Sequence, residues 1–441
     1  MKLYTLIASL LFSLFIFAQE QHVTSDAKVW TLEECIAYAL AHNITVQQAN
    51  INRQLTEVAL MESKSSRLPS LSGVASQNFT NGNTIDPITS DFVSQQINST
   101  SLSLNTSITL FQGNQISNQI KQSKLLVDQY QLYEQESQNN ITLSITEAYI
   151  QLLYAKEAIK IAENNVSTSQ KEEERAKALF DAGSLAIRDY TDAKSQTATN
   201  NYNLIAATNT YDLQLLDLKQ LLELSSSDSF AVVDGVEYLP ENVPELQEVY
   251  SEAVAILPEI NASKTNVQVS EKALDIAKGG YLPTLSLTGS LGSGYTSTQA
   301  LNFTDQFDGN FNQRVGLSLN VPIFNKNKTK AAVQEAQLNI DNAALQLAQE
   351  EKDLYVKVET AWKNTIATQS QLNAAYIARN AAKESYRLAQ KQYELGALST
   401  TDLILSQNTY TNTEQNYIQA KYLNLLYNQL LQFYQGNQIS I

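Results

Sequence analysis

Four segments of the chain alternate between apolar and polar residues, at 70–80, 100–111, 284–296 and 311–324. A period of two predicts β-strands whose two faces differ. About ten residues is the length at which a tilted strand crosses a bilayer. We therefore expect the apolar face to contact lipid, and its positions are Leu102, Leu104, Ile108, Leu110, Leu285, Leu287, Val315, Leu317, Leu319 and Val321.

The opposite faces carry small hydroxyls and amides and almost no Lys or Glu. Such a face is typical of a watery lumen, while a sheet packed on a soluble core is the alternative. The loop within each strand pair is polar, and we expect it outside the membrane. These loops are 81–97, with Asp86 and Asp91, and 297–310, with Asp305 and Asp308.

Four strands are too few to form a barrel, because about eight are the practical minimum. An open sheet edge in hydrocarbon leaves backbone groups unpaired, at several kcal/mol each. Several chains must therefore pool their strands, as a dimer, a trimer or a tetramer.

Long helices are predicted at 113–182 and 327–395, where proline is absent. The first helix carries a heptad pattern typical of a coiled coil, at Ile141, Ile145, Ala148, Leu152, Ala155, Ile159, Ala162 and Val166. The second helix follows the same pattern, with interruptions at Thr365 and Thr368.

Shorter helices at 186–223 and 399–435 are expected to return antiparallel to the long ones, after turns at Gly183 and Gly396. Helices at 44–66 and 258–279 stack on their ends. The charged run 172–175 is expected to be a solvated helix face.

The chain contains two copies of one unit. At an offset of 214 residues, 31–72 and 245–286 share 14 identities in 42 positions, and at 213 the match continues through Gly183 and Gly396. We assign 19–224 and 245–441 to the two repeats and 225–244 to a linker. A short strand is expected near Phe230.

Residues 1–18 combine Lys2, an apolar run and Ala18, which predicts a signal peptide cleaved near Ala18. Beyond it no apolar stretch is long enough for a spanning helix. Cys35 lies far from the cleavage point, so we predict that the protein is not a lipoprotein and that Cys35 is a buried apolar residue.

The formal charge of −15 argues against binding to nucleic acid. His22 and His42 have no metal-ligand spacing, and neither a phosphate loop nor a nucleophile motif is present. We therefore predict no metal, no cofactor and no enzymatic activity.

The duplicated motifs resemble those of the TolC-like outer membrane efflux protein family. The residues that carry the resemblance are Leu68-Pro69 and Leu282-Pro283 before strands, the segment 321–324, and above all the hairpin turns 180–189 and 393–402. The resemblance covers nearly the whole mature chain.

This resemblance implies a mainly α protein with a membrane β-barrel, in which long coiled-coil helices form an α-barrel. It implies a homotrimer with twelve strands in the outer membrane and a helical tunnel through the periplasm. The tunnel would be a passive exit duct, coupled through a periplasmic adaptor protein to an inner-membrane transporter of RND or ABC type. The cargo is not predicted.

Carried over by position, the adaptor-docking tips would be Gly183, Ser184, Leu185, Gly396, Ala397 and Leu398. Asp402 would form an acidic ring at the tunnel entrance, and Tyr393 would hydrogen-bond Asp189 in the closed state. Helix capping is the alternative role for both aspartates. Leu405 stands where some family members have a second acidic ring.

Two rival functions remain at this point. A general diffusion porin would conduct without partners, and a soluble periplasmic coiled-coil binding protein would not need detergent.

Overall fold

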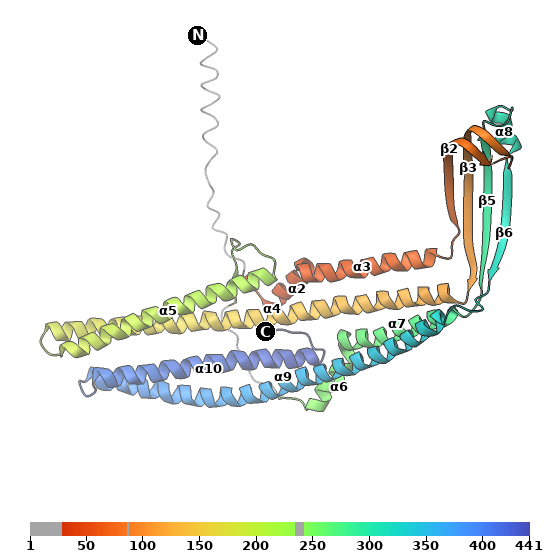
Figure 1. Cartoon of the computed structure of the whole chain (residues 1–441). Helices are drawn as coiled ribbons and strands as arrows, with labels where there is room; N and C mark the ends of the chain where they lie inside the picture. The colour runs from red at the N-terminus through yellow and green to blue at the C-terminus, as the bar shows by residue number, and fades with distance from the viewer. Residues whose placement is uncertain (1–28, 86–87, 234–241) are drawn as a thin grey trace, which may run out of the picture.

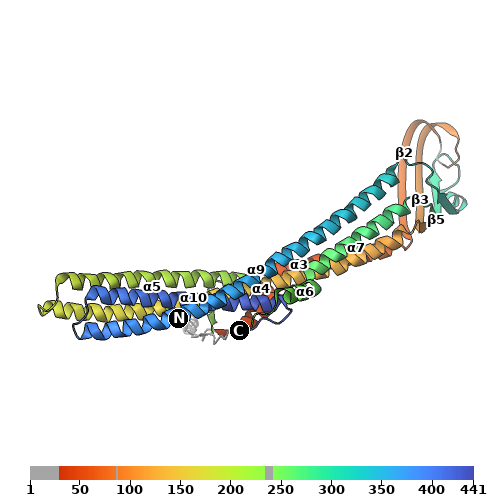
Figure 2. The same cartoon turned by 90° about the horizontal axis from the view of Figure 1, so that it is seen from below.

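The computed structural model describes residues 29–85, 88–233 and 242–441. Long helices run side by side along the molecule, and a β-sheet stands at one end of them (Figure 1). A view from below shows the same elongated shape, with the helical hairpins at the end opposite the sheet (Figure 2). The predicted signal peptide and His22 lie outside the described residues. Within the described ranges, no helix is both long and apolar enough to span a bilayer.

Each copy contributes two short helices, one very long helix and one of intermediate length. The bounds of α7 coincide with the predicted 258–279, and α3, α4, α5, α9 and α10 lie within a few residues of their predicted ends, whereas no bounds were predicted for α2 and α6. The first copy has α2 (Leu32–His42), α3 (Ile44–Ser65), α4 (Gln115–Asp181) and α5 (Ile187–Leu221), and the second has α6 (Leu246–Ile256), α7 (Pro258–Gly279), α9 (Lys328–Glu394) and α10 (Thr400–Tyr434).

The long helices form antiparallel hairpins, α4 with α5 and α9 with α10. The predicted heptad positions of α4 form a seam that is buried except at half-buried Ile159. In α9 the interruptions Thr365 and Thr368 are also buried, and the Asn424 side chain donates to the Thr368 hydroxyl over 3.0 Å. Since buried polar groups are costly unless paired, this contact fixes how α9 and α10 align.

Linker residues 231–232 and the first described residues, 29–30, lie side by side next to α4. β4 (Ala231–Val232) pairs in parallel with β1 (Val29–Trp30), near the predicted short strand. Cys35 is fully buried in the adjoining core, as predicted. Thr31 and Glu34 form a capping box at the start of α2.

The sheet consists of β2 (Ser70–Ile85), β3 (Phe92–Gln112), β5 (Thr284–Thr296) and β6 (Asn312–Asn320), all antiparallel and in that order. The β-hairpin formed by β2 and β3 is longer than predicted, because pairing continues to Ile85 opposite Phe92. Most of the loop expected at 81–97 is therefore strand. Asp86 lies outside the described residues, and the second loop contains the short helix α8 (Phe303–Gly309).

Two details near the helical end of the sheet differ from simple alternation. Thr109 and Phe111 pair with consecutive residues of β5, so Leu110 is a β-bulge, which places Phe111 opposite Leu285 on the apolar side. The prediction that β6 includes Val321 was wrong. The strand ends at Asn320, because Pro322 follows and has no N–H for the ladder.

Gly113 lets β3 turn into α4 beside the end of α7. Its φ is +55°, and a Cβ there would lie 2.3 Å from the carbonyl oxygen of Gly279. The equivalent Lys326 of the second copy adopts the same left-handed region, with φ of 54°.

Candidate functional site

The sheet has one apolar face that the described chain leaves largely uncovered. The register places Leu104 opposite Leu291, and Leu287 opposite both Ile108 and Leu317, so apolar residues of β3, β5 and β6 share this face. Ile108, Leu285 and Leu287 are half-buried. The others are exposed, up to 81% at Val315 in the outer strand, and are Leu102, Leu104, Leu110, Val315, Leu317 and Leu319. A large exposed apolar patch marks a site of contact with another protein, a ligand or a membrane.

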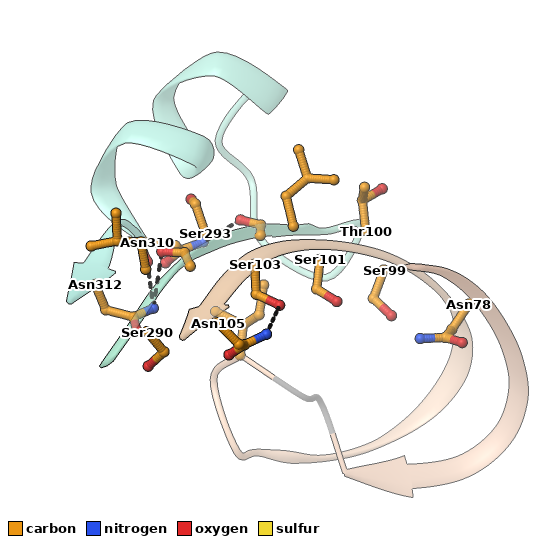
Figure 3. A pocket seen from close by; sticks show the side chains of 15 residues that line it. Asn78, Ser99, Thr100, Ser101, Ser103, Asn105, Ser290, Ser293, Asn310 and Asn312 are labelled. Carbon is orange, nitrogen blue, oxygen red and sulfur yellow. Dashed lines mark hydrogen bonds between the residues drawn. The ribbon is translucent and has the colours of Figure 1, made fainter. Parts of the chain in front are cut away.

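The other face is a polar hollow of about 520 Å³, lined by serines and asparagines from all four strands (Figure 3). Hydroxyls pair across the first hairpin, with Oγ–Oγ distances of 2.7 Å between Ser76 and Ser101 and 3.0 Å between Ser70 and Ser107. The Asn105 amide donates to Ser103. These groups satisfy one another and still present oxygen and nitrogen atoms to water.

The sheet ends in two edges, β2 and β6, that pair with no other strand of the described chain. Because neighbouring strands alternate in direction, β6 runs opposite to β2. The β6 edge of one copy can therefore pair antiparallel with the β2 edge of the next, for any number of copies.

At the far end of the molecule, both hairpin turns are Schellman motifs. In the first, the N–H groups of Gly183 and Ser184 donate to the carbonyls of Phe180 and Leu179. In the second, Gly396 and Ala397 donate to Tyr393 and Gln392. The glycines adopt φ of 73° and 74°, where other residues are strained.

The predicted tip residues thus lie in the turns that join α4 to α5 and α9 to α10, and both hairpins end on the same side of the molecule (Figure 2). Gly183, Ser184, Gly396 and Ala397 are exposed, whereas Leu185 and Leu398 are half-buried. Leu398 packs against a small cluster around Tyr386 and Leu403.

Asp402 takes part in helix capping, the alternative role, as the first-turn partner of the N-cap Ser399. The Ser399 hydroxyl accepts from the Asp402 N–H over 3.1 Å and donates to its carboxylate over 2.7 Å. The carboxylate is otherwise exposed, so a role in an ionic ring is compatible with capping. In the first copy Ala186 occupies the cap, and α5 has no side-chain cap bond, although Asp189 lies in its first turn.

Replacing Ser399 with alanine is expected to loosen the first turn of α10, because losing an N-cap costs about 1 kcal/mol. Ala186→Ser should have the opposite effect on α5 by creating the missing cap. Hydrogen exchange at the Asp402 and Asp189 amides measures both. Unchanged exchange at Asp402 in the Ser399 variant would contradict this role.

The structure does not pair Tyr393 with Asp189. In this single chain the Tyr393 hydroxyl accepts from Thr400 over 3.4 Å. The hairpins are linked elsewhere: the Tyr386 hydroxyl of α9 donates to Glu172 of α4 over 3.3 Å, and Gln390 donates to Tyr386 over 2.9 Å.

Arg175 makes a second link between the hairpins. Its Nη2 donates to the carbonyl of Glu394 over 3.1 Å, and its guanidinium lies 5.3 Å from the centre of the Tyr393 ring. The expectation that 172–175 is simply a solvated helix face was therefore wrong for Glu172 and Arg175. Both side chains are half-buried against the other hairpin.

Burial raises the pKa of the Glu172 carboxyl above its ordinary value, although hydrogen bonds from Tyr386 and Gln390 and the charge of Arg175 oppose the shift. Burial and the neighbouring Glu172 also raise the pKa of Tyr386. A carboxylate held this way makes the contact between the hairpins sensitive to pH.

The family model described as "Outer membrane efflux protein" matches residues 35–223 and 249–437. The chain belongs to the outer membrane efflux protein family. The two matched segments correspond to the two predicted copies.

Known members of the family align along most of the chain. Outer membrane protein TolC of Escherichia coli is 26% identical over 307 residues, which are 67% of this chain and 61% of TolC. Outer membrane efflux protein BepC of Brucella suis is 22% identical over 404 residues, 89% of this chain and 82% of BepC. The crystal structure of VceC from Vibrio cholerae superposes with a TM-score of 0.79 at 15% identity, over 93% of this chain and 97% of VceC.

These comparisons confirm the predicted family and fold class, mainly helical with strands for a membrane barrel. An outer membrane channel for efflux or secretion is also confirmed at the level of the family. The chain spans about three fifths of the length of the Escherichia coli relative.

Proposed function

We propose that three copies of this chain form a passive exit channel through the outer membrane, extending into the periplasm. The observation that carries this proposal is the open sheet with one exposed apolar face, one polar face and two free edges. Closing those edges between copies satisfies the backbone groups that hydrocarbon would leave unpaired. The apolar face then contacts outer-membrane lipid, and the polar face lines water.

The hairpin tips are the proposed docking surface for a periplasmic adaptor protein, through Gly183 to Leu185 and Gly396 to Leu398. An inner-membrane transporter of RND or ABC type supplies the energy, and the channel performs no chemistry on its cargo and needs no cofactor. Residues 1–18 act as a signal peptide, with cleavage near Ala18 and no lipid anchor. The assignment of the docking surface is supported by the family resemblance and by the exposed Schellman turns.

The tips also form the proposed gate. The contact of Tyr386 with Glu172 holds α9 against α4, while Asp402 contributes one carboxylate per chain to an acidic ring at the entrance. The predicted contact of Tyr393 with Asp189 is a further proposal for the assembled closed tunnel.

Disulfide cross-linking between the free edges tests the proposed barrel. Within one chain β3 and β5 separate β2 from β6, so their residues are about 14 Å apart at a spacing of about 4.8 Å per strand. A disulfide bridges Cα atoms only up to about 7 Å apart. A cysteine replacing Ser318 in β6 is therefore combined in turn with cysteines replacing Ser70, Ser72, Val74 or Ser76 in β2.

At least one combination is expected to give covalent dimers and trimers in membranes after oxidation. The single-cysteine variants are the controls, since native Cys35 is buried. Native mass measurement in detergent should give three chains. Monomers alone in every combination, together with a monomeric mass, would refute the proposal.

Two measurements exclude the rival functions. A general diffusion porin would show a large open conductance without partners, whereas we expect a low conductance from the purified protein. A soluble binding protein would be recovered without detergent, whereas we expect the chain in the outer-membrane fraction.

A further inference from the structure

The sheet carries a single charged residue. Among the residues of the four described strands β2, β3, β5 and β6, only Arg314 has a charged side chain. In a chain of net charge −15, the isolated charge within the sheet is positive. This feature is not explained by the contacts of the fold, since none of the ion pairs formed by the described residues involves Arg314.

The register places Arg314 on the polar face. It pairs with Ser290, which pairs in turn with Asn105, and Asn105 pairs with Ser72. One row across the sheet therefore carries a hydroxyl, an amide, a hydroxyl and a guanidinium. Arg314 is exposed, and Ser290 and Asn105 line the polar hollow (Figure 3). The neighbouring Val315 lies on the apolar face, opposite Gly289.

We propose that the three Arg314 side chains of the assembled channel form a cationic ring inside the barrel that binds and favours anionic cargo. The ring rests on the proposed trimer, because a closed wall of three sheets places one Arg314 every four strands around the lumen. Its ligands are carboxylate, sulfate or phosphate groups, which a guanidinium binds through two parallel hydrogen bonds.

The dimensions of the barrel make this ring effective. Twelve strands about 4.8 Å apart and tilted by about 40° give a wall of radius roughly 12 Å. Each guanidinium extends inward from that wall, so it lies closer to the axis than this radius. The Debye length is about 8 Å at physiological ionic strength. A solute passing through the barrel therefore stays within the field of at least one guanidinium.

The position of the ring also separates it from the tip carboxylates. Arg314 lies in β6 and Asp402 in the first turn of α10, and α9 extends between them. A helix of that length spans about 100 Å at about 1.5 Å per residue, so the two charges are far more than a Debye length apart. The entrance and the exit of the tunnel thus act on cargo independently. A molecule favoured by both ends carries positive and negative groups, and the barrel selects for the negative ones.

Charged thiol reagents measure this ring without requiring an open gate, because they reach the barrel from outside. Ser290→Cys places a thiol beside Arg314, and buried Cys35 leaves it as the reactive site. The rates of modification by a negatively charged and a positively charged methanethiosulfonate are compared in purified trimers. Their ratio cancels differences in the thiolate fraction.

The rate of modification by the negative reagent is divided by the rate for the positive reagent. We expect this ratio to fall about fivefold when Arg314→Gln is combined with Ser290→Cys, since two unit charges about 6 Å apart in water interact appreciably. Arg314→Lys, which keeps the charge, should retain the ratio. The matched control is a thiol at Ser318, about 13 Å along β6 from Arg314. Its ratio of reaction rates should change little when Arg314→Gln is added.

The outcomes separate the ring from the channel. If Ser290→Cys reacts with both reagents and Arg314→Gln leaves the ratio unchanged, the ring is refuted and the channel stands. If the thiol at Ser290 reacts with neither reagent, the polar face does not line water, and the proposed channel itself is refuted.

Discussion

Replacing Leu317 with arginine is expected to abolish assembly of the channel. Leu317 is 66% exposed on the apolar face of the outermost strand, opposite Leu287. An arginine on the lipid face near the bilayer centre costs about 2–4 kcal/mol per chain, and three copies raise this to about 6–12 kcal/mol per trimer. Loss of the trimer band from detergent extracts of outer membranes measures the effect.

Ser318→Arg is the matched control, because the adjacent residue of the same strand faces the opposite side of the sheet. The same charge then points into water, and the trimer should form in normal yield. Equal yields of the two variants would show that the apolar face does not contact lipid.

The alternation that identified the strands covers only part of the sheet. Where one face is apolar and the other polar, the register of β3, β5 and β6 keeps Leu104, Leu287 and Leu317 on one side, as expected. In 81–97 apolar and polar residues no longer alternate, although the backbone still pairs. The extension of the first hairpin to Ile85 and Phe92 could not be predicted for this reason.

Local exceptions to the strand pattern have local causes. The bulge at Leu110 lies where Leu110 and Phe111 place two apolar residues in succession, a signal that sequence reasoning could have used. The end of β6 before Val321 follows from Pro322, whose effect on the ladder outweighs the continuing alternation.

Contacts between the two hairpins were the least predictable part of the candidate site. Glu172 and Tyr386 are 214 residues apart in sequence, and Gln196 donates to Asn408, 212 residues away. Both separations are close to the repeat offset, because equivalent positions of the two copies lie side by side. The offset could have located these pairs, whereas the motif of the turn pointed only to Tyr393.

Replacing Tyr386 with phenylalanine is expected to weaken the gate and raise the open probability of the channel at least tenfold. The change removes the donor that Glu172 receives from the other hairpin and leaves a half-buried carboxylate underpaired, which costs about 1–3 kcal/mol per chain. Each 1.4 kcal/mol is a factor of ten, and the trimer has three such links. Single-channel recording in planar bilayers measures the open probability.

Tyr376→Phe is the control for this substitution, because Tyr376 lies exposed on the same helix and its ring contacts Tyr417 of α10, within its own hairpin. It should leave the open probability unchanged. A Tyr386 variant as closed as the unmodified channel would exclude this contact as the gate.

The same contact predicts how pH acts on the gate. In the closed tip, burial raises the pKa of Glu172 above the ordinary 4.5 despite Arg175, Tyr386 and Gln390, and opening restores solvent. Protonation therefore favours the closed tip: this stabilisation is complete below about pH 4.5 and is lost as pH rises through the raised pKa. Open probability should increase with pH across that window. Glu172→Gln, which keeps an acceptor without the charge, should remain closed and remove this dependence, and an unaltered pH profile in that variant would assign the effect to another group.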